Sequence, residues 1–147
     1  MVHYEGEKGF SAAPPEIWSK LSDARFLAGC VPNAEAVLRA ESTIAEFKLR
    51  PGLSFVRGVL TVVLQVVEAE ANKHVRYRAV GKGIGSGSTV EAAVTLAPHD
   101  AGTHAGWTVD VTELTGLLKA VPRGLIQASA QKVIDELWNS VADKLEN

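Results

Sequence analysis

One stretch of the sequence, residues 120–145, carries apolar side chains at steps of three and four residues. This spacing places them on one face of a helix, while the opposite face carries polar side chains with charges of both signs. The apolar face consists of Val121, Leu125, Ile126, Val133, Ile134, Leu137, Trp138, Val141 and Leu145. The small residues Ala128, Ser129 and Ala130 lie at its middle. We therefore predict a long helix that is narrow at its centre, where it either admits a sheet closely or leaves a space.

Most of the chain before this helix alternates apolar and polar residues, as β-strands do. Residues 3–12 predict a first strand. Two short helices follow, because Pro14 and Pro15 suit a first helical turn and Ser22-Asp23 suits the cap of a second helix. The segment 29–33 ends this unit in a turn. Residues 34–114 then predict about six further strands joined by short turns.

Short connections imply that neighbouring strands run antiparallel. The alternation buries one face of the sheet, and only the long helix is large enough to cover that face. We therefore predict one α+β domain over residues 1–147. It is a curved antiparallel sheet of about seven strands around a long C-terminal helix, with two short helices after the first strand.

Composition narrows the classes of function. Apolar residues make up 46% of the 147 residues and charged residues 22%, and the formal net charge is -2, which argues against disorder and against a nucleic-acid partner. The sequence contains no apolar run long enough to cross a bilayer and no signal-like N-terminus, so we expect a cytoplasmic protein. Cys30 is the only cysteine, which excludes an internal disulfide and a cysteine-cluster metal site.

The sequence offers little support for catalysis, for a metal or for a cofactor. The glycine-rich segment 81–88 leads into a strand and lacks the order of a phosphate-binding loop, so we interpret it as a bulged hairpin. His99 and His104 flank a polar turn, where imidazoles are usually solvated. Cys30 lies in an apolar context typical of a buried thiol. We therefore name no catalytic residue, no metal ligand and no cofactor.

The remaining cluster of interest is apolar and faces the predicted helix. Its members, which we predict to line either a solid core or a cavity, are Phe10, Phe26, Leu27, Phe47, Leu49, Val56, Leu60, Val62, Tyr77, Val94, Trp107, Val109, Leu125, Ser129 and Val133. Small inward residues on the strands, Ala79, Gly81, Gly83 and Ala92, remove volume in the same way as the small residues of the helix. The residues alone leave solid core and cavity equally open.

Several short segments together carry a resemblance to a known family. They are Tyr4-Glu5-Gly6, Ala13-Pro14-Pro15-Glu16-Ile17-Trp18, Cys30-Val31-Pro32-Asn33, Arg57-Gly58 and Gly81-Lys82-Gly83. With the terminal helix, and in this order, they resemble the carbon monoxide dehydrogenase CoxG family, which belongs to the START/Bet v 1-like (SRPBCC) superfamily. The resemblance implies a helix-grip fold with a deep apolar cavity between sheet and helix.

The resemblance also implies a function. Members of this family are accessory proteins of aerobic carbon monoxide dehydrogenases and related molybdenum hydroxylases, associated with maturation, membrane association or delivery of a lipophilic quinone. The leading hypothesis is therefore a non-enzymatic protein that binds a quinone or isoprenoid-like lipid and serves such an enzyme, with peripheral contact to the inner face of the cell membrane. Trp107, Tyr77 or Ser129 would orient a polar head group.

Two other hypotheses stay open at this point. One is an enzyme of the cyclase or hydratase kind, which this superfamily includes. It would need an ionisable group inside the cavity, and we predict Lys8 and Glu113 as the inward-facing candidates. The other is a scaffold with a solid core that forms a homodimer through the outer side of a strand, at Phe55, Val59 and Val63.

Overall fold

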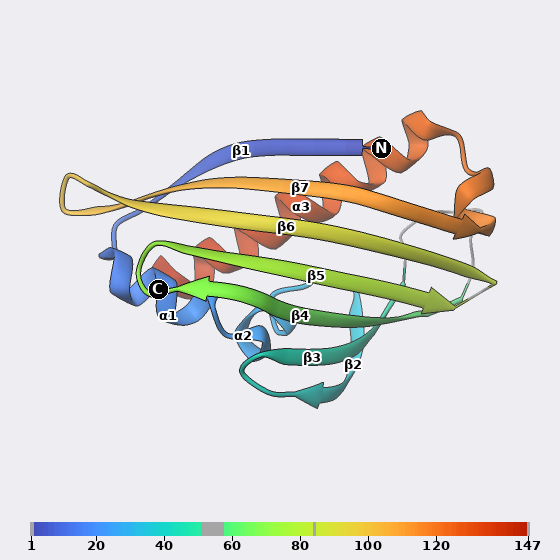
Figure 1. Ribbon diagram of the computed structural model, residues 1–147, viewed down its shortest axis with the longest axis horizontal. Helices are drawn as coiled ribbons and strands as arrows, with labels where there is room; N and C mark the ends of the chain where they lie inside the picture. Colours follow the sequence, from blue (N-terminus) through green and yellow to red (C-terminus); the bar gives the residue numbers. More distant parts are fainter. Residues whose placement is uncertain (1, 51–57, 84, 147) are drawn as a thin grey trace.

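The computed structural model describes residues 2–50, 58–83 and 85–146, which form a seven-stranded sheet with a long helix across its inner face (Figure 1). The strands are β1 (Val2–Phe10), β2 (Ala34–Ala40), β3 (Ile44–Leu49), β4 (Leu60–Glu70), β5 (His74–Gly83), β6 (Ser86–His99) and β7 (Gly102–Gly116). The helices are α1 (Pro14–Leu21), α2 (Ala24–Ala28), the 3-10 helix η1 (Leu117–Ala120) and α3 (Arg123–Glu146). The predicted order of elements is confirmed.

The strands lie in the order β1-β7-β6-β5-β4-β3-β2, and every pair is antiparallel. From β2 to β7 each strand pairs with the next one along the chain, as short connections predict. Strand β1 instead pairs with β7, from Val2 opposite Val111 to Phe10 opposite Thr103. The first and the last strand of the chain therefore lie side by side, which leaves β1 and β2 as the two edges.

The turn after β1 leads into the two short helices, and the residues on which their prediction rests lie at the start of each helix. Pro14 and Pro15 occupy the first turn of α1, where amide protons have no helical partner. Asp23 caps α2, because its carboxylate accepts a hydrogen bond of 2.9 Å from the backbone N–H of Arg25. Asn33, at φ 63°, takes the left-handed conformation expected of the turn before β2.

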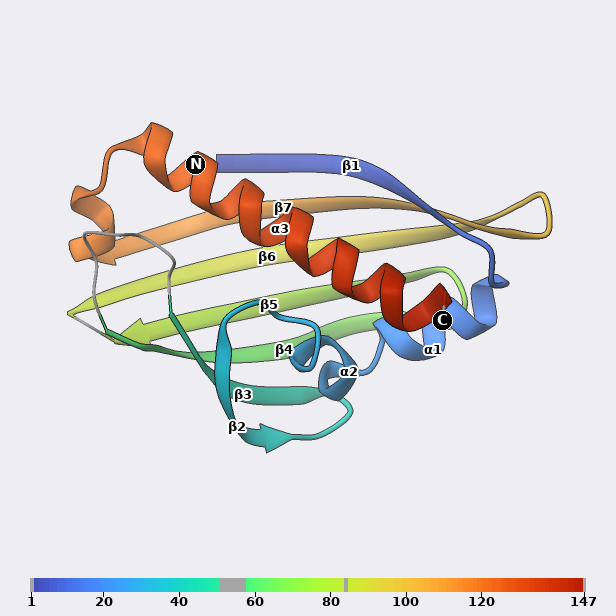
Figure 2. The same ribbon diagram turned by 180° about the vertical axis from the view of Figure 1, so that it is seen from behind.

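Helix α3 crosses the sheet diagonally and ends beside α1 (Figure 2). Near its start, the Tyr4 hydroxyl of β1 donates a hydrogen bond of 3.0 Å to the carbonyl oxygen of Gln127. At its end, the Glu146 carboxylate accepts a hydrogen bond of 2.9 Å from the backbone N–H of Ser11. The Lys144 ammonium donates to the carbonyl oxygen of Gly29, which follows α2. The helix is therefore fixed at both ends to the strand and the loops that frame the sheet.

The glycine-rich segment forms the predicted hairpin, although without the predicted bulge. Gly83 lies opposite Ser86, and the β5–β6 register continues without a shift to His74 opposite Thr95. Gly85 has a φ of 63°, which glycine adopts at little cost. Ile84 lies outside the described residues, as do residues 51–57 of the segment in which we predict strands and turns.

Bulges elsewhere in the sheet change which residues face inward. The β6–β7 register shifts between Thr89 and Val90, so Thr112 is an extra residue between Val111 and Glu113. Glu113 consequently lies opposite Thr89 and is exposed. Our prediction that Glu113 faces inward is wrong, because a bulge reverses the alternation on which it rested.

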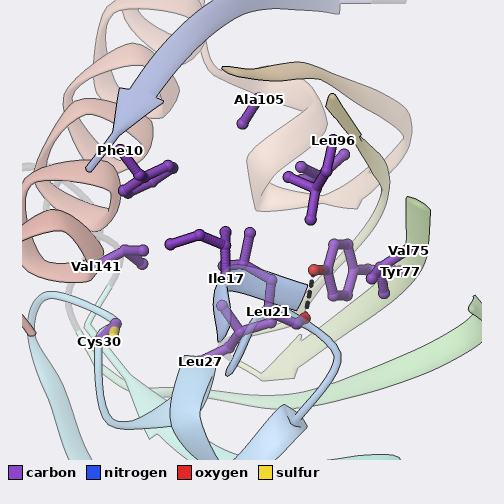
Figure 3. Packing of buried hydrophobic residues seen from close by; sticks show 11 residues of the cluster. Phe10, Ile17, Leu21, Leu27, Cys30, Val75, Tyr77, Leu96, Ala105 and Val141 are labelled. Carbon is purple, nitrogen blue, oxygen red and sulfur yellow. Dashed lines mark hydrogen bonds between the residues drawn. The ribbon is translucent and has the colours of Figure 1, made fainter. Parts of the chain in front are cut away.

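Two apolar clusters fill the ends of the space under α3. The first gathers around α1 and includes Ile17, Leu21, Tyr77 and Val141 (Figure 3). The second gathers around α2, β3 and η1, with Phe47, Leu60, Val62, Leu118 and Ile126 among its members. Both clusters bury side chains of the sheet against helices. Whether the region between the clusters is filled or empty depends on how far the side chains at the centre extend.

Gly6 of β1 lies opposite Trp107, whose indole occupies the space that a side chain at Gly6 would take. A Cβ atom there would lie 2.6 Å from Trp107 Cζ2, which is closer than atoms pack. We expect Gly6→Ala to lower the free energy of unfolding by about 1–3 kcal/mol in urea titrations. Gly9→Ala on the same strand is the control, because nothing lies within 4 Å of its Cβ position. Equal stability of the two variants would contradict this packing.

Candidate functional site

A cavity of about 290 Å³ lies between the inner face of the sheet and α3. Its volume falls at the lower end of the range of about 300–1,000 Å³ that is typical of small-molecule pockets. Strands β3 to β7 and all three α-helices contribute to its lining, which contains no charged side chain within the described ranges. The structure therefore has a cavity where the sequence left solid core and cavity open.

Most of the predicted lining residues lie around this cavity. They are Leu27, Phe47, Leu49, Leu60, Val62, Tyr77, Val94, Trp107, Val109 and Val133. They come together because positions of one parity on neighbouring strands share a face of the sheet, and α3 lies across that face. Their role in ligand binding stays a prediction.

Phe10 and Phe26 do not line the cavity, contrary to our prediction. Phe10 is buried, with its ring centroid 6.2 Å from that of Trp138, and belongs to the cluster around α1. Phe26 is half-buried, and the Lys20 ammonium lies 5.8 Å from the centroid of its ring. Both rings pack between elements at the end of the sheet, where helices fill the space.

Leu125 and Ser129 also do not line the cavity, because the helix turns them away from it. The buried residues of α3 are Ile126, Ile134 and Val141, which define its inward direction. With about 3.6 residues per turn, Leu125 and Ser129 lie more than about 90° from the centre of that stripe. Leu125 is 46% exposed. Val56, the last of the predicted lining residues, lies outside the described residues.

Sequence reasoning missed part of the lining, notably Leu21, Val31, Ser88 and Val90. Leu21 is apolar, but its helical spacing from Ile17 and Trp18 indicates only that it lies on the apolar face of the short helix, not that it reaches the cavity. Ser88 and Val90 follow the glycine-rich hairpin, and their alternation with Ala92 and Val94 is the signal that could have found them.

The space itself comes from the sheet. Ala79, Gly81 and Ala92 line the cavity, as the sequence predicted for small inward residues. Ala128, Ser129 and Ala130 of the helix do not line it, although the sequence suggested them as a second source of space. The part of α3 that covers the cavity is the more bulky half, from Val133 to Val141.

An aromatic group forms one wall of the cavity. The ring centroids of Trp107 on β7 and Trp138 on α3 lie 6.1 Å apart, with an angle of 35° between the ring planes. This tilted arrangement is within the range of favourable aromatic pairs. Trp107 rests on Gly6, so a glycine on the edge strand helps to set the position of this wall.

Tyr77 is the most polar of the buried lining residues, yet its hydroxyl proton already takes part in a hydrogen bond within the protein. The hydroxyl donates a hydrogen bond of 2.5 Å to the carbonyl oxygen of Leu21, at the last residue of α1 (Figure 3). Burial raises the pKa of Tyr77 well above its ordinary value, so the phenol stays neutral. This bond joins β5 to the end of α1 at the edge of the cavity.

The side chains that could act in catalysis do not lie in the cavity. Lys8 is half-buried on β1 and does not belong to the lining, and Glu113 is exposed. Cys30 is only 3% exposed, and burial raises the pKa of its thiol, which confirms the expectation of a buried thiol. Within the described ranges, no group of three or more histidine, cysteine, aspartate or glutamate side chains could hold a metal ion.

The predicted homodimer and the predicted membrane contact both concern the outer surface of the protein. Val59 and Val63 are half-buried, while Phe55 lies outside the described residues, so the homodimer stays a prediction. Peripheral membrane contact stays a prediction as well. No helix in the described part of the chain is long and apolar enough to cross a bilayer.

Comparison with known proteins gives a family and a fold. The family model for CoxG, a subunit of carbon monoxide dehydrogenase, matches residues 6–146. No curated protein matches the sequence.

Solved structures resemble the chain over nearly its whole length. A conserved protein from Geobacillus kaustophilus is 19% identical, with a TM-score of 0.84 over 98% of this chain and 95% of that one. A START superfamily protein from Mycobacterium smegmatis is 14% identical, with a TM-score of 0.68 over 97% and 96%. Ara h 8.0201 is 13% identical, with a TM-score of 0.66 over 98% and 97%. The predicted START/Bet v 1-like, helix-grip fold is confirmed.

Removing the Tyr77 hydroxyl leaves the Leu21 carbonyl oxygen without its partner in a buried position. We expect Tyr77→Phe to lower the free energy of unfolding by about 1–3 kcal/mol. Tyr4→Phe is the matched control, because its hydrogen bond to the Gln127 carbonyl oxygen is exposed and water can replace it. Its effect should stay within about 0.5 kcal/mol. Urea unfolding followed by circular dichroism measures both; equal losses would contradict the role given to Tyr77.

Proposed function

The chain belongs to the carbon monoxide dehydrogenase CoxG family, and from this premise we propose that it binds a lipophilic small molecule in the cavity. The molecule we propose is a quinone or an isoprenoid lipid, bound without chemical change. The observation that carries the proposal is the cavity of about 290 Å³ under α3. Protein interiors are close-packed, so an apolar space of this size in a small domain is best explained by a ligand.

The lining suits such a ligand. Burial of apolar ligand surface is worth about 25 cal/mol per Å², and the cavity offers apolar side chains on nearly every side. The Trp107 and Trp138 rings provide flat surfaces for an aromatic or quinone ring. Aliphatic side chains such as Leu49, Leu60 and Val62 suit a branched hydrocarbon chain.

The polar groups support binding rather than chemistry. General acid–base catalysis needs an ionisable group in reach of the substrate. In the described lining only Tyr77 can ionise, and its neutral phenol is bonded to the backbone. A cyclase or hydratase would therefore have to work without Lys8 or Glu113, the two residues that the sequence suggested for it.

The second part of the proposal concerns the partner. Family membership supports a role beside a carbon monoxide dehydrogenase-type molybdenum hydroxylase, either in its maturation or in coupling it to membrane quinones. A protein that encloses a quinone would carry it through water, where the free molecule is poorly soluble. Delivery to the redox enzyme and peripheral contact with the membrane would be two ends of the same route.

Native mass spectrometry of protein purified without detergent tests the ligand. We expect a mass increment of one lipophilic molecule per chain, which organic extraction then identifies. Ala92 lies on the inner face between Tyr77 and Val109, so Ala92→Leu should fill part of the cavity and lower the occupancy several-fold. Ala97→Leu, at an exposed position of the same strand, should leave the occupancy unchanged.

Two results would contradict the binding proposal. One is wild-type protein that is empty and also fails to take up decylubiquinone or a short-chain isoprenoid alcohol. The other is an occupancy that falls equally in the Ala92→Leu and Ala97→Leu variants, since the ligand would then be bound elsewhere.

A steady-state assay tests the role of the partner. We expect the quinone-loaded protein to raise the rate at which a purified carbon monoxide dehydrogenase-type enzyme reduces quinone, compared with the same amount of quinone added alone. The Ala92→Leu variant should give little or no increase, because it holds less quinone. An unchanged rate with the loaded wild-type protein would contradict delivery while leaving ligand binding intact.

A further inference from the structure

The cavity has few polar groups with which to recognise a head group. Besides Tyr77, its polar lining residues are Ser88 and Thr108, and Trp107 and Trp138 each add an indole N–H. Thr108 lies between the inward residues Trp107 and Val109 on β7, so alternation turns its side chain to the outer face. Tyr77 already donates its proton to the Leu21 carbonyl oxygen. In the described lining three hydrogen-bond donors remain, on Trp107, Trp138 and Ser88.

The three donors have different surroundings. The Trp138 indole belongs to α3, with its ring centroid 6.1 Å from that of Trp107. The edge of Trp107 that carries its nitrogen lies over Gly6, where a Cβ atom would be 3.1 Å from Nε1. This N–H therefore lies on the side of the edge strand β1. Ser88 lies opposite Gly81, and a Cβ atom on Gly81 would be 3.1 Å from Ser88 Oγ and 3.6 Å from Val62 Cγ2. The hydroxyl is therefore on the inner face, among apolar groups.

Among the described lining residues, Ser88 has an inward-facing hydroxyl without a partner. Within the described part of the chain this hydroxyl makes no hydrogen bond. A Cβ atom on Gly81 would meet Ser88 Oγ together with methyl groups of Val62 and Leu60, so the hydroxyl and these apolar groups face the same part of the cavity. The Ser88 side chain is half-buried, and once a ligand displaces water from the cavity, a hydroxyl without a partner costs free energy. A ligand oxygen that accepts its proton would remove that cost.

The charge of the lining sets a second condition. In the described lining there is no lysine, arginine or histidine side chain that could balance an anion. An ionised carboxylate would lose its hydration in the cavity and gain no opposite charge in return. Fatty-acid anions are therefore poor ligands. A neutral carbonyl group loses much less hydration free energy on entering the cavity, and it can still accept a hydrogen bond there.

We propose that Ser88 determines specificity in this cavity, donating a hydrogen bond to the carbonyl oxygen of a neutral head group and thereby selecting neutral carbonyl lipids over carboxylate lipids. This inference rests on the proposed binding function, and it names the chemical class of ligand. The absence of charge in the described lining disfavours the anion, and the Ser88 hydroxyl orients the neutral molecule with its oxygen near Gly81.

Three probes of one chain length separate the contributions: octane, methyl octanoate and octanoate. Their affinities are measured by displacement of Nile red at neutral pH, and the emission of Trp107 and Trp138 reports entry into the cavity that these residues line. We expect methyl octanoate to bind about tenfold or more tightly than octanoate. Ser88→Ala should weaken methyl octanoate about fivefold and leave octane unchanged, because only the ester loses a hydrogen bond.

Thr95→Ala is the matched control, since it removes a hydroxyl from an exposed position on the same strand. It should leave all three affinities unchanged. Equal affinity of octanoate and methyl octanoate would overturn the inference, as would an equal loss of octane and ester affinity in Ser88→Ala. If none of the three probes binds, both the inference about Ser88 and the proposed function fail. If octane binds but the ester has no advantage, binding stands and only the role of Ser88 falls.

Discussion

The structure depends on a mismatch in width between one helix and a seven-stranded sheet. Strands lie about 4.8 Å apart, so seven of them span roughly 30 Å, whereas a helix with its side chains is about 10–12 Å across. Helix α3 cannot cover the inner face alone, even when it crosses diagonally (Figure 2). The short helices α1 and α2 and the 3-10 helix η1 close the two ends, each over its own apolar cluster. The cavity is the part of the face between these covers.

Much of this arrangement could be predicted from the sequence. The helical spacing of residues 120–145 predicts the helix, and strict alternation in segments such as Phe47-Lys48-Leu49 predicts strands with a buried face. The prolines and Asp23 predict the two short helices. These signals are local, and each agrees with the final topology. The pairing of β1 with β7 joins segments far apart in the chain, and its register could not be obtained from local patterns.

The site could be predicted less well, for physical reasons that particular residues illustrate. Alternation gave the correct face for Tyr77, Trp107 and Val62, but the bulge at Thr112 reversed it for Glu113. Leu125 belongs to the apolar face predicted from helical spacing, but it lies more than about 90° from the centre of the stripe that is buried, and it is exposed. A cavity is a small difference between the space that the backbone encloses and the volume of the side chains. Small residues on either wall could have produced it, and those of the sheet did.

The order of the elements in the chain affects how the protein acquires its core. All seven strands precede α3, so a growing chain has made its whole sheet before the helix that covers the inner face is synthesised. Strand β1 must also wait for β7, the last strand, before it finds its neighbour. Uncovered apolar strands are prone to aggregate, and pairings between distant segments form slowly. If the proposed lipophilic ligand occupied the uncovered face early, it would shield that face, and loading and folding would then be one event during biosynthesis.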